Sequence, residues 1–184
     1  FLTDSGSEGA DLGVQVLGGH GFIRANAQEQ YVRDVRITQI YEGTNGVQAM
    51  DLLTRKVLHL DLFDSFAAPL RDFIEAKEAD EALSEFLAPL AASHDLLEDA
   101  TRYIRERAAD HPEEAGAAAV DYLRLFALTS LAYLWTRAAE VSLPRGNDDF
   151  HRAKLATARF FMQRILPDTA ALHAKIGSGA GPVM

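Results

Sequence analysis

The sequence predicts an all-α protein, and three observations support this fold class. Apolar residues recur at steps of three and four along most of the 184 residues, which is the period of an amphipathic helix. β-branched and polar residues never alternate over a useful length, so no strand pattern competes. Glycine and proline fall mainly between the periodic stretches, as expected of turns. With 48% hydrophobic residues, the chain can build the core of one domain or of two small helical ones.

Three helices are predicted in the first part of the chain. The first is already under way at residue 1 and ends at the Gly18-Gly19 pair, where glycine takes a positive φ at little cost. The start inside an apolar stripe, with no initiator Met, indicates a fragment of a longer protein. The second helix covers residues 27–40, and the loop of residues 42–46 follows it. A third helix starts near Gly46 or Val47. Its apolar positions are Met50, Leu53, Val57 and Leu60.

Residues 80–176 are predicted to form three long antiparallel helices, each with an apolar seam. The first seam contains Leu83, Leu87, Leu90, His94, Leu97, Thr101, Ile104 and Ala108. The second seam contains Val120, Leu123, Ala127, Leu131, Leu134 and Ala138. The third seam contains Phe150, Thr157, Phe161, Ile165, Leu172 and Ile176.

The breaks between these helices have recognisable signals. The first helix starts or bends at Pro89, since proline lacks the N–H that a helix interior needs. Residues 110–114 and 144–148 are loops, and Asn147 or Asp148 caps the last helix. The tail, residues 177–181, is glycine-rich and expected to be flexible.

Composition excludes several function classes. The net charge is −9, from 18 basic and 27 acidic residues, and no basic cluster suits nucleic acid. No apolar run approaches the roughly 20 residues of a membrane span. The chain has no cysteine, which removes disulfides and thiolate sites and fits a cytoplasmic protein. None of the six histidines pairs at ligand spacing with a third partner, so no metal site is predicted.

Few residues are candidates for chemistry. Glu42 stands in a loop before Gly43; it serves as a general base if a pocket desolvates it, and otherwise it is an exposed loop carboxylate. The glycines around His20 form either a phosphate nest or a helix end, and the residues favour the helix end. The Arg33-Asp34 pair is interpreted as a structural ion pair or helix-end clamp, and His94 as a hydrogen-bonded core residue.

Three ordered motifs together carry a family resemblance. They are Gln15-x-x-Gly18-Gly19-x-Gly21-Phe22, then Arg33-Asp34-x-Arg36-Ile37, then Ile40-Tyr41-Glu42-Gly43-Thr44 with Gln48 after it. With this spacing, residues 1–66 resemble the C-terminal helices of acyl-CoA dehydrogenases. Residues 75–184 resemble the extra C-terminal helical domain of one branch, which includes 3-methylmercaptopropionyl-CoA dehydrogenases. The resemblance implies three parts: residues 1–66 of the helical bundle, a linker at 67–79, and the additional antiparallel helical domain at 80–184.

The resemblance also implies a reaction and a cofactor. Glu42 would remove the α-proton of an acyl-CoA while the β-hydrogen leaves as hydride to FAD, and the Glu42 N–H would hold the thioester carbonyl. Gly43 would lie against the substrate, and Thr44 would contact FAD. Gln15, Gly18 and Gly19 would reach FAD bound mainly by a neighbouring subunit. The expected partners are therefore an acyl-CoA, a second subunit in a homodimer or dimer of dimers, and an electron-transfer flavoprotein.

Two other functions stay open at this point. An acyl-CoA oxidase would share fold and base, and a non-catalytic helical module for oligomerisation would explain the apolar seams. In either enzymatic reading the 184-residue chain alone is expected to be inactive, because most of the flavin site would precede residue 1.

Overall fold

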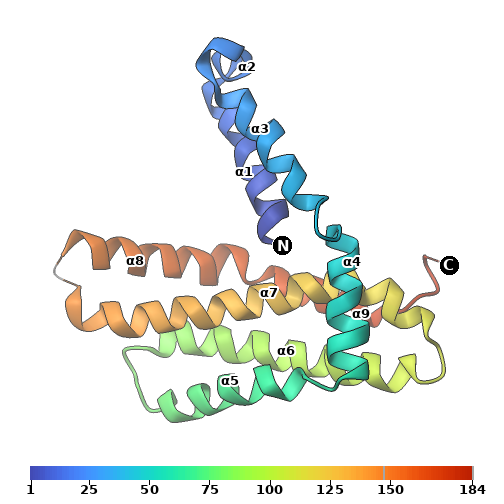
Figure 1. Cartoon of the computed structure of the whole chain (residues 1–184). Helices are drawn as coiled ribbons and strands as arrows, with labels where there is room; N and C mark the ends of the chain where they lie inside the picture. The colour runs from blue at the N-terminus through green and yellow to red at the C-terminus, as the bar shows by residue number, and fades with distance from the viewer. Residues whose placement is uncertain (147, 184) are drawn as a thin grey trace. The chain divides into compact units, whose positions relative to one another are not determined.

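The fold is helical throughout the part of the chain that the computed structural model describes, residues 1–146 and 148–183, and no strand occurs there (Figure 1). This confirms the predicted fold class. Two compact units make up the chain, Phe1–Gln48 and a larger unit from Ala49 onward.

The first unit is a helical hairpin. Helix α1 (Leu2–Leu17) packs along α3 (Gln28–Arg36), and the short helices α2 (Gly19–Phe22) and η1 (Arg24–Asn26) connect them (Figure 1). Helix α1 ends as predicted at Gly18, whose φ of 59° favours glycine, although its ψ of −142° lies outside the left-handed helical region. The predicted helix over 27–40 is α3 followed by a tight turn, η2 (Ile37–Gln39).

Small residues let the two arms of the hairpin approach closely. A Cβ on Gly13 would come within 2.3 Å of Gln28 Nε2, and one on Gly21 within 2.5 Å of the Val14 carbonyl oxygen. The hairpin nevertheless buries no large side chain: Gly21 is its one buried residue, while Val16 is 84% and Phe22 79% exposed. The apolar stripes of this unit are therefore not covered by the unit itself.

The predicted third helix begins at α4 (Asn45–Met50) and continues into η3 (Asp51–His59), a π-helix. Its wider turn is visible in the bond from the Leu60 N–H to the Arg55 carbonyl, 2.8 Å, five residues back. Leu53 and Val57 are buried as expected, but Met50 and Leu60 are 40% and 46% exposed.

The expected linker is a helix. Residues 67–77 of the predicted linker lie inside α5 (Phe63–Lys77). Aromatic contacts hold α5 against α7: the ring centroids of Phe66 and Phe126 are 4.2 Å apart and those of Phe73 and Tyr133 are 5.2 Å apart. The domain assignment in the intact protein stays a prediction.

Helices α6 (Ser84–Ala108) and α7 (Glu113–Ser142) form the centre of the second unit. The predicted seam of α6 is confirmed, with every member buried except the half-buried Ala108. Pro89 neither starts nor ends this helix, which begins five residues earlier. Across the interface the hydroxyls of Thr101 and Tyr122 lie 2.7 Å apart, both fully buried.

His94 is a core residue as predicted, but the expected hydrogen bond is incomplete. Its side chain is 3% exposed, and among the described residues Nε2 has no hydrogen-bond partner. Glu98 Oε1 lies 3.7 Å from Nε2, which is too long for a hydrogen bond.

The predicted seam of α7 was wrong. Val120 and Leu134 are 55% and 58% exposed, and the other four members are half-buried. The buried face instead contains Ala118, Tyr122, Leu125, Thr129, Ala132, Thr136 and Ala139.

The stretch Glu113–Arg145 is long and apolar enough, by length and composition, to cross a membrane, with mean hydropathy 1.3. This corrects the expectation that no segment of the chain could span one. In the structure this stretch packs against α6, α8, α9 and η3 as a core helix.

The predicted last helix consists of three pieces. They are α8 (Asp149–Phe160), the π-helix η5 (Phe161–Ile165) and α9 (Asp168–Gly177), and Pro167 precedes the third. Asp148 caps α8 by accepting the His151 N–H at 2.9 Å, whereas Asn147 lies outside the described residues. Of the predicted seam, Phe161, Leu172 and Ile176 are buried, Ile165 is half-buried, and Phe150 and Thr157 are exposed. In Figure 1, α5, α6, α7 and α8 run side by side.

The tail is docked and not free. Ala180 is 4% exposed, and its N–H donates to Glu114 Oε2 at 3.0 Å. The same carboxylate accepts from Arg107 at 2.9 and 3.2 Å, and this hydrogen-bonded charge lowers the pKa of Glu114. A buried backbone N–H held by a paired carboxylate fixes the tail, contrary to the expected flexibility.

Candidate functional site

The loop that carries Glu42 is fastened to the start of α1 by polar side chains. Asp4 Oδ1 accepts from Gln39 Nε2 and from Asn45 Nδ2, both at 2.6 Å. Thr3 Oγ1 donates to Asn45 Oδ1 at 3.0 Å. These bonds reach both ends of the loop, so its two ends are fixed to one turn of helix. No local sequence signal marks Thr3 or Asp4 for this role.

Within the loop, two successive residues have positive φ. Glu42 has φ 52° and Gly43 has φ 93°. For glycine this conformation is ordinary, but for a glutamate it is sparsely populated and persists only where the surroundings hold it. Here the Gln48 side chain holds it: Nε2 donates to the Glu42 carbonyl oxygen at 3.0 Å.

Within the described residues, the backbone N–H groups of Glu42, Gly43 and Thr44 have no hydrogen-bond partner. The Gln48 N–H bonds the Thr44 carbonyl at 3.0 Å and so starts α4. The Glu42 side chain is exposed, as are Gly43 and Thr44. The loop therefore presents a carboxylate and a free backbone donor from the same residue.

The six predicted site residues fall into two groups. Glu42, Gly43 and Thr44 lie beside the start of α1, as the Thr3–Asn45 bond shows. Gln15, Gly18 and Gly19 lie at its far end, around the C-cap. The twelve residues from Thr3 to Gln15 correspond to a rise of about 18 Å. The structure thus brings together three residues at each end of the hairpin and keeps the two groups apart.

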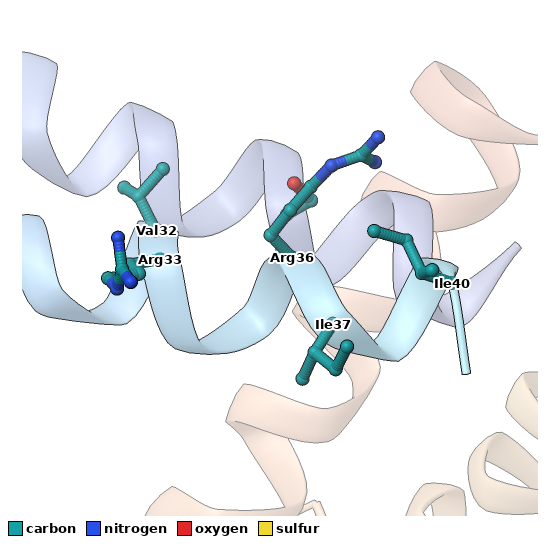
Figure 2. Close-up of a pocket in the computed structure, with 6 residues that line it drawn as sticks. Val32, Arg33, Arg36, Ile37 and Ile40 are labelled. Atoms are coloured by element: carbon teal, nitrogen blue, oxygen red, sulfur yellow. The ribbon is translucent and has the colours of Figure 1, made fainter.

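A hollow of about 490 Å³ lies on the same unit, lined by residues that precede the Glu42 loop in the sequence. Its lining comes from Ser7 of α1 and from one stretch of α3 and η2: Val32, Arg33, Arg36, Ile37 and Ile40, labelled in Figure 2. Arg33 and Asp34 form no ion pair with each other among the described residues, so the ion-pair interpretation was wrong, while the helix-end clamp stays a prediction. Asp34 accepts from Gln30 at 2.6 Å instead, because residues one apart on a helix do not face each other.

No group of three His, Asp or Glu side chains within the described ranges could hold a metal ion. The sequence predicted no role for Gln48, although this residue belongs to the third motif. Gln48 closes the third motif, and its amide is the group that reaches back to Glu42.

Comparison with known proteins agrees with the three motifs. Residues 1–57 match the family model described as acyl-CoA dehydrogenase, C-terminal domain, and residues 66–184 match the one described as acetyl-CoA dehydrogenase C-terminal like. The chain belongs to the acyl-CoA dehydrogenase family.

Relatives with assigned names match most of the chain. A 3-methylmercaptopropionyl-CoA dehydrogenase of Ruegeria pomeroyi is 36% identical over 188 aligned positions, covering 96% of this chain and 31% of the relative. A butyryl-CoA dehydrogenase of Syntrophomonas wolfei is 25% identical, covering 91% of this chain and 29% of the relative. A broad-specificity linear acyl-CoA dehydrogenase of Mycobacterium tuberculosis is 27% identical, covering 84% and 28%. The chain therefore spans about a third of the length of the relatives it matches.

Proposed function

We propose that this chain supplies the catalytic base and part of the FAD site of an acyl-CoA dehydrogenase that forms the α,β double bond of an acyl-CoA thioester. The observation that carries the proposal is the conformation of Glu42, a glutamate held at φ 52° with its own N–H free. Strained non-glycine residues cluster at functional sites, where the surrounding structure maintains them.

Glu42 performs two tasks in this reaction. Its carboxylate takes the α-proton of the thioester as general base. Its N–H donates to the thioester carbonyl oxygen, where negative charge develops as the proton leaves. One such donor is worth about 3 kcal/mol of barrier. Gly43, without a side chain, lets the thioester lie against the loop. FAD, when bound, accepts the β-hydrogen as hydride.

The residues at both ends of the hairpin suit FAD contact. A Cβ at Gly18 or Gly19 would meet nothing within 4 Å, so the backbone there is open to a ligand, and Gln15 is exposed. Thr44 is exposed beside Glu42. About 18 Å of helix separates the two groups. In this proposal Thr44 contacts the flavin of its own subunit and Gln15, Gly18 and Gly19 that of a neighbour, which requires a homodimer or dimer of dimers.

The exposed apolar stripes of the first unit support the same picture. Leu2, Val16 and Phe22 are each more than 70% exposed. Large apolar side chains this exposed along a small unit are expected where another surface covers them. In the proposal, the rest of the enzyme covers these apolar side chains. The 184-residue chain alone then neither retains FAD nor turns over substrate. An electron-transfer flavoprotein reoxidises the intact enzyme.

An anaerobic titration of the intact enzyme with acyl-CoA substrates tests the proposal. Wild type is compared with Glu42→Gln and with Glu8→Gln, a control that removes an exposed carboxylate of α1. Substrate should bleach the flavin in wild type and in Glu8→Gln, and not in Glu42→Gln. Equal bleaching in all three would remove Glu42 as the base. Rapid reaction of the reduced enzyme with oxygen would assign an oxidase instead.

A further inference from the structure

The Gln48 side chain crosses over Gly43 to reach Glu42. Its Nε2 lies 3.0 Å from the Glu42 carbonyl oxygen and would lie 2.9 Å from a Cβ built on Gly43. Its backbone N–H bonds the Thr44 carbonyl. Gln48, which lies in the first turn of α4, therefore holds two carbonyl groups of the loop, those of Glu42 and Thr44.

This contact fixes the peptide that follows Glu42. The carbonyl oxygen of Glu42 is turned toward Gln48, the residue has positive φ, and its N–H has no partner among the described residues. An extended or right-handed Glu42, which glutamate prefers, would re-aim both the carboxylate and the N–H. The side-chain amide is the one interaction found on the Glu42 carbonyl in the described residues.

We propose that Gln48 is a positioning residue for Glu42, whose amide holds the base and its backbone donor in the reactive orientation. This rests on the proposed function. Gln48 acts through Glu42 and exchanges no proton itself, because a glutamine amide is neutral and does not titrate. Gly43 belongs to the same device, since any side chain there would displace the amide.

The test measures anaerobic flavin reduction in the intact enzyme by stopped flow. Gln48→Leu keeps the approximate size of the side chain and removes the hydrogen-bond donor. Gln48→Glu keeps the shape of the side chain, but at neutral pH its carboxylate can only accept hydrogen bonds. Gln30→Leu is the matched control, since Gln30 is an exposed glutamine of α3 whose amide bonds Asp34 and not the loop. We expect the reduction rate at saturating substrate to fall on the order of 10- to 100-fold in both Gln48 variants. Substrate dissociation constant and FAD content should stay near wild type, and Gln30→Leu should react as wild type does.

The double variant separates positioning from general damage. Adding Gln48→Leu to Glu42→Gln should lower the residual rate less than Gln48→Leu lowers the wild-type rate, because the base is already gone and only the retained backbone N–H of residue 42 is left to misplace. A further fall of the same size as in the wild-type background would overturn the proposal. Wild-type rates in Gln48→Leu and Gln48→Glu would also overturn it. If Glu42→Gln itself reduced flavin at the wild-type rate, the proposed function would fail, whatever the Gln48 variants did. If Gln48→Leu lost FAD, Gln48→Glu with unchanged FAD content would carry the comparison.

Discussion

At the scale of single residues, Gly43 shows how tightly the Glu42 loop constrains its sequence. Its φ of 93° disfavours every L side chain, and an added Cβ would sit 2.9 Å from Gln48 Nε2. We predict that Gly43→Ala lowers the rate of flavin reduction in the intact enzyme at least 10-fold, because the loop must shift or release the Gln48 amide. Gly116→Ala on α7 is the control, since nothing lies within 4 Å of its Cβ. A Gly43→Ala enzyme as fast as Gly116→Ala would contradict this account of the loop.

Tyr122 is the residue whose protonation is tied to the core. Burial raises its pKa to about 12, while the Thr101 hydroxyl, 2.7 Å away, acts in the opposite direction. The unfolded tyrosine, with a pKa of about 10, ionises first as pH rises, so folding loses stability between about pH 10 and 12. We predict that Tyr122→Phe costs about 1 kcal/mol at pH 7, where one buried hydrogen bond is lost. The same variant should remove most of the alkaline loss.

Denaturant unfolding at pH 7 and pH 11 measures both effects. The exposed Tyr31 supplies the control, because Tyr31→Phe removes a hydroxyl at the surface. If wild type and Tyr122→Phe lost equal stability between these pH values, Tyr122 would not be the group responsible.

At the scale of elements, the Glu114 carboxylate joins the start of α7 to the tail. It accepts from Arg107 and from the Ala180 N–H, and its pKa is lowered by those contacts, with Arg107 first. A lowered folded pKa stabilises the docked tail above the unfolded pKa of about 4.3, and this is lost as pH falls through the folded value. We predict that Glu114→Gln frees residues 178–183 at neutral pH. Faster amide exchange at Ala180 would show it, and Glu113→Gln, an exposed neighbour, should leave that exchange unchanged.

The distribution of polar and apolar residues around each helix explains which buried faces could be predicted from the sequence. The seam of α6 was confirmed because polar residues occupy its other faces, so the apolar period has one solution. Helix α7 is rich in Ala and Leu all round and packs against neighbouring elements on several sides, so its period does not select a face. Helices α8 and α9 were predicted as one because apolar residues recur at helical spacing on both sides of Pro167. The π-helix η5 lies between them, and the predicted seam is exposed at Phe150 and Thr157 but buried at Leu172 and Ile176.

The candidate site also has some features that the sequence predicts and others that it does not. The loop position of Glu42 and Gly43 could be predicted from the sequence, because the amphipathic helical pattern is interrupted there at a glycine. Asp4 could not, since it reaches Gln39 and Asn45 from more than 30 residues away and no local pattern records that contact. The opposite placement of Gln15 and Thr44 likewise follows only from the hairpin. The sequence therefore predicts which residues lie in the loop, whereas the side chains that fix the loop in place become known only from the tertiary structure.

At the scale of the whole molecule, burial differs sharply between the two units. The second unit has a continuous core that includes Leu53, Leu70, Phe86, Leu97, Tyr122 and Leu125, each at most 2% exposed. The first unit spans 48 residues and buries only Gly21. Chains of that size rarely fold without additional burial.

We therefore predict that residues 49–184 fold alone and that residues 1–48 do not. The larger piece should unfold in one cooperative transition, at a denaturant midpoint close to that of the second unit in the 184-residue chain. The smaller piece should show little helical circular dichroism, because isolated helices of 9 and 16 residues are marginal in water. A stable, cooperatively melting 1–48 peptide would mean that the hairpin contacts suffice. A 49–184 piece without a cooperative transition would mean that its core depends on the hairpin.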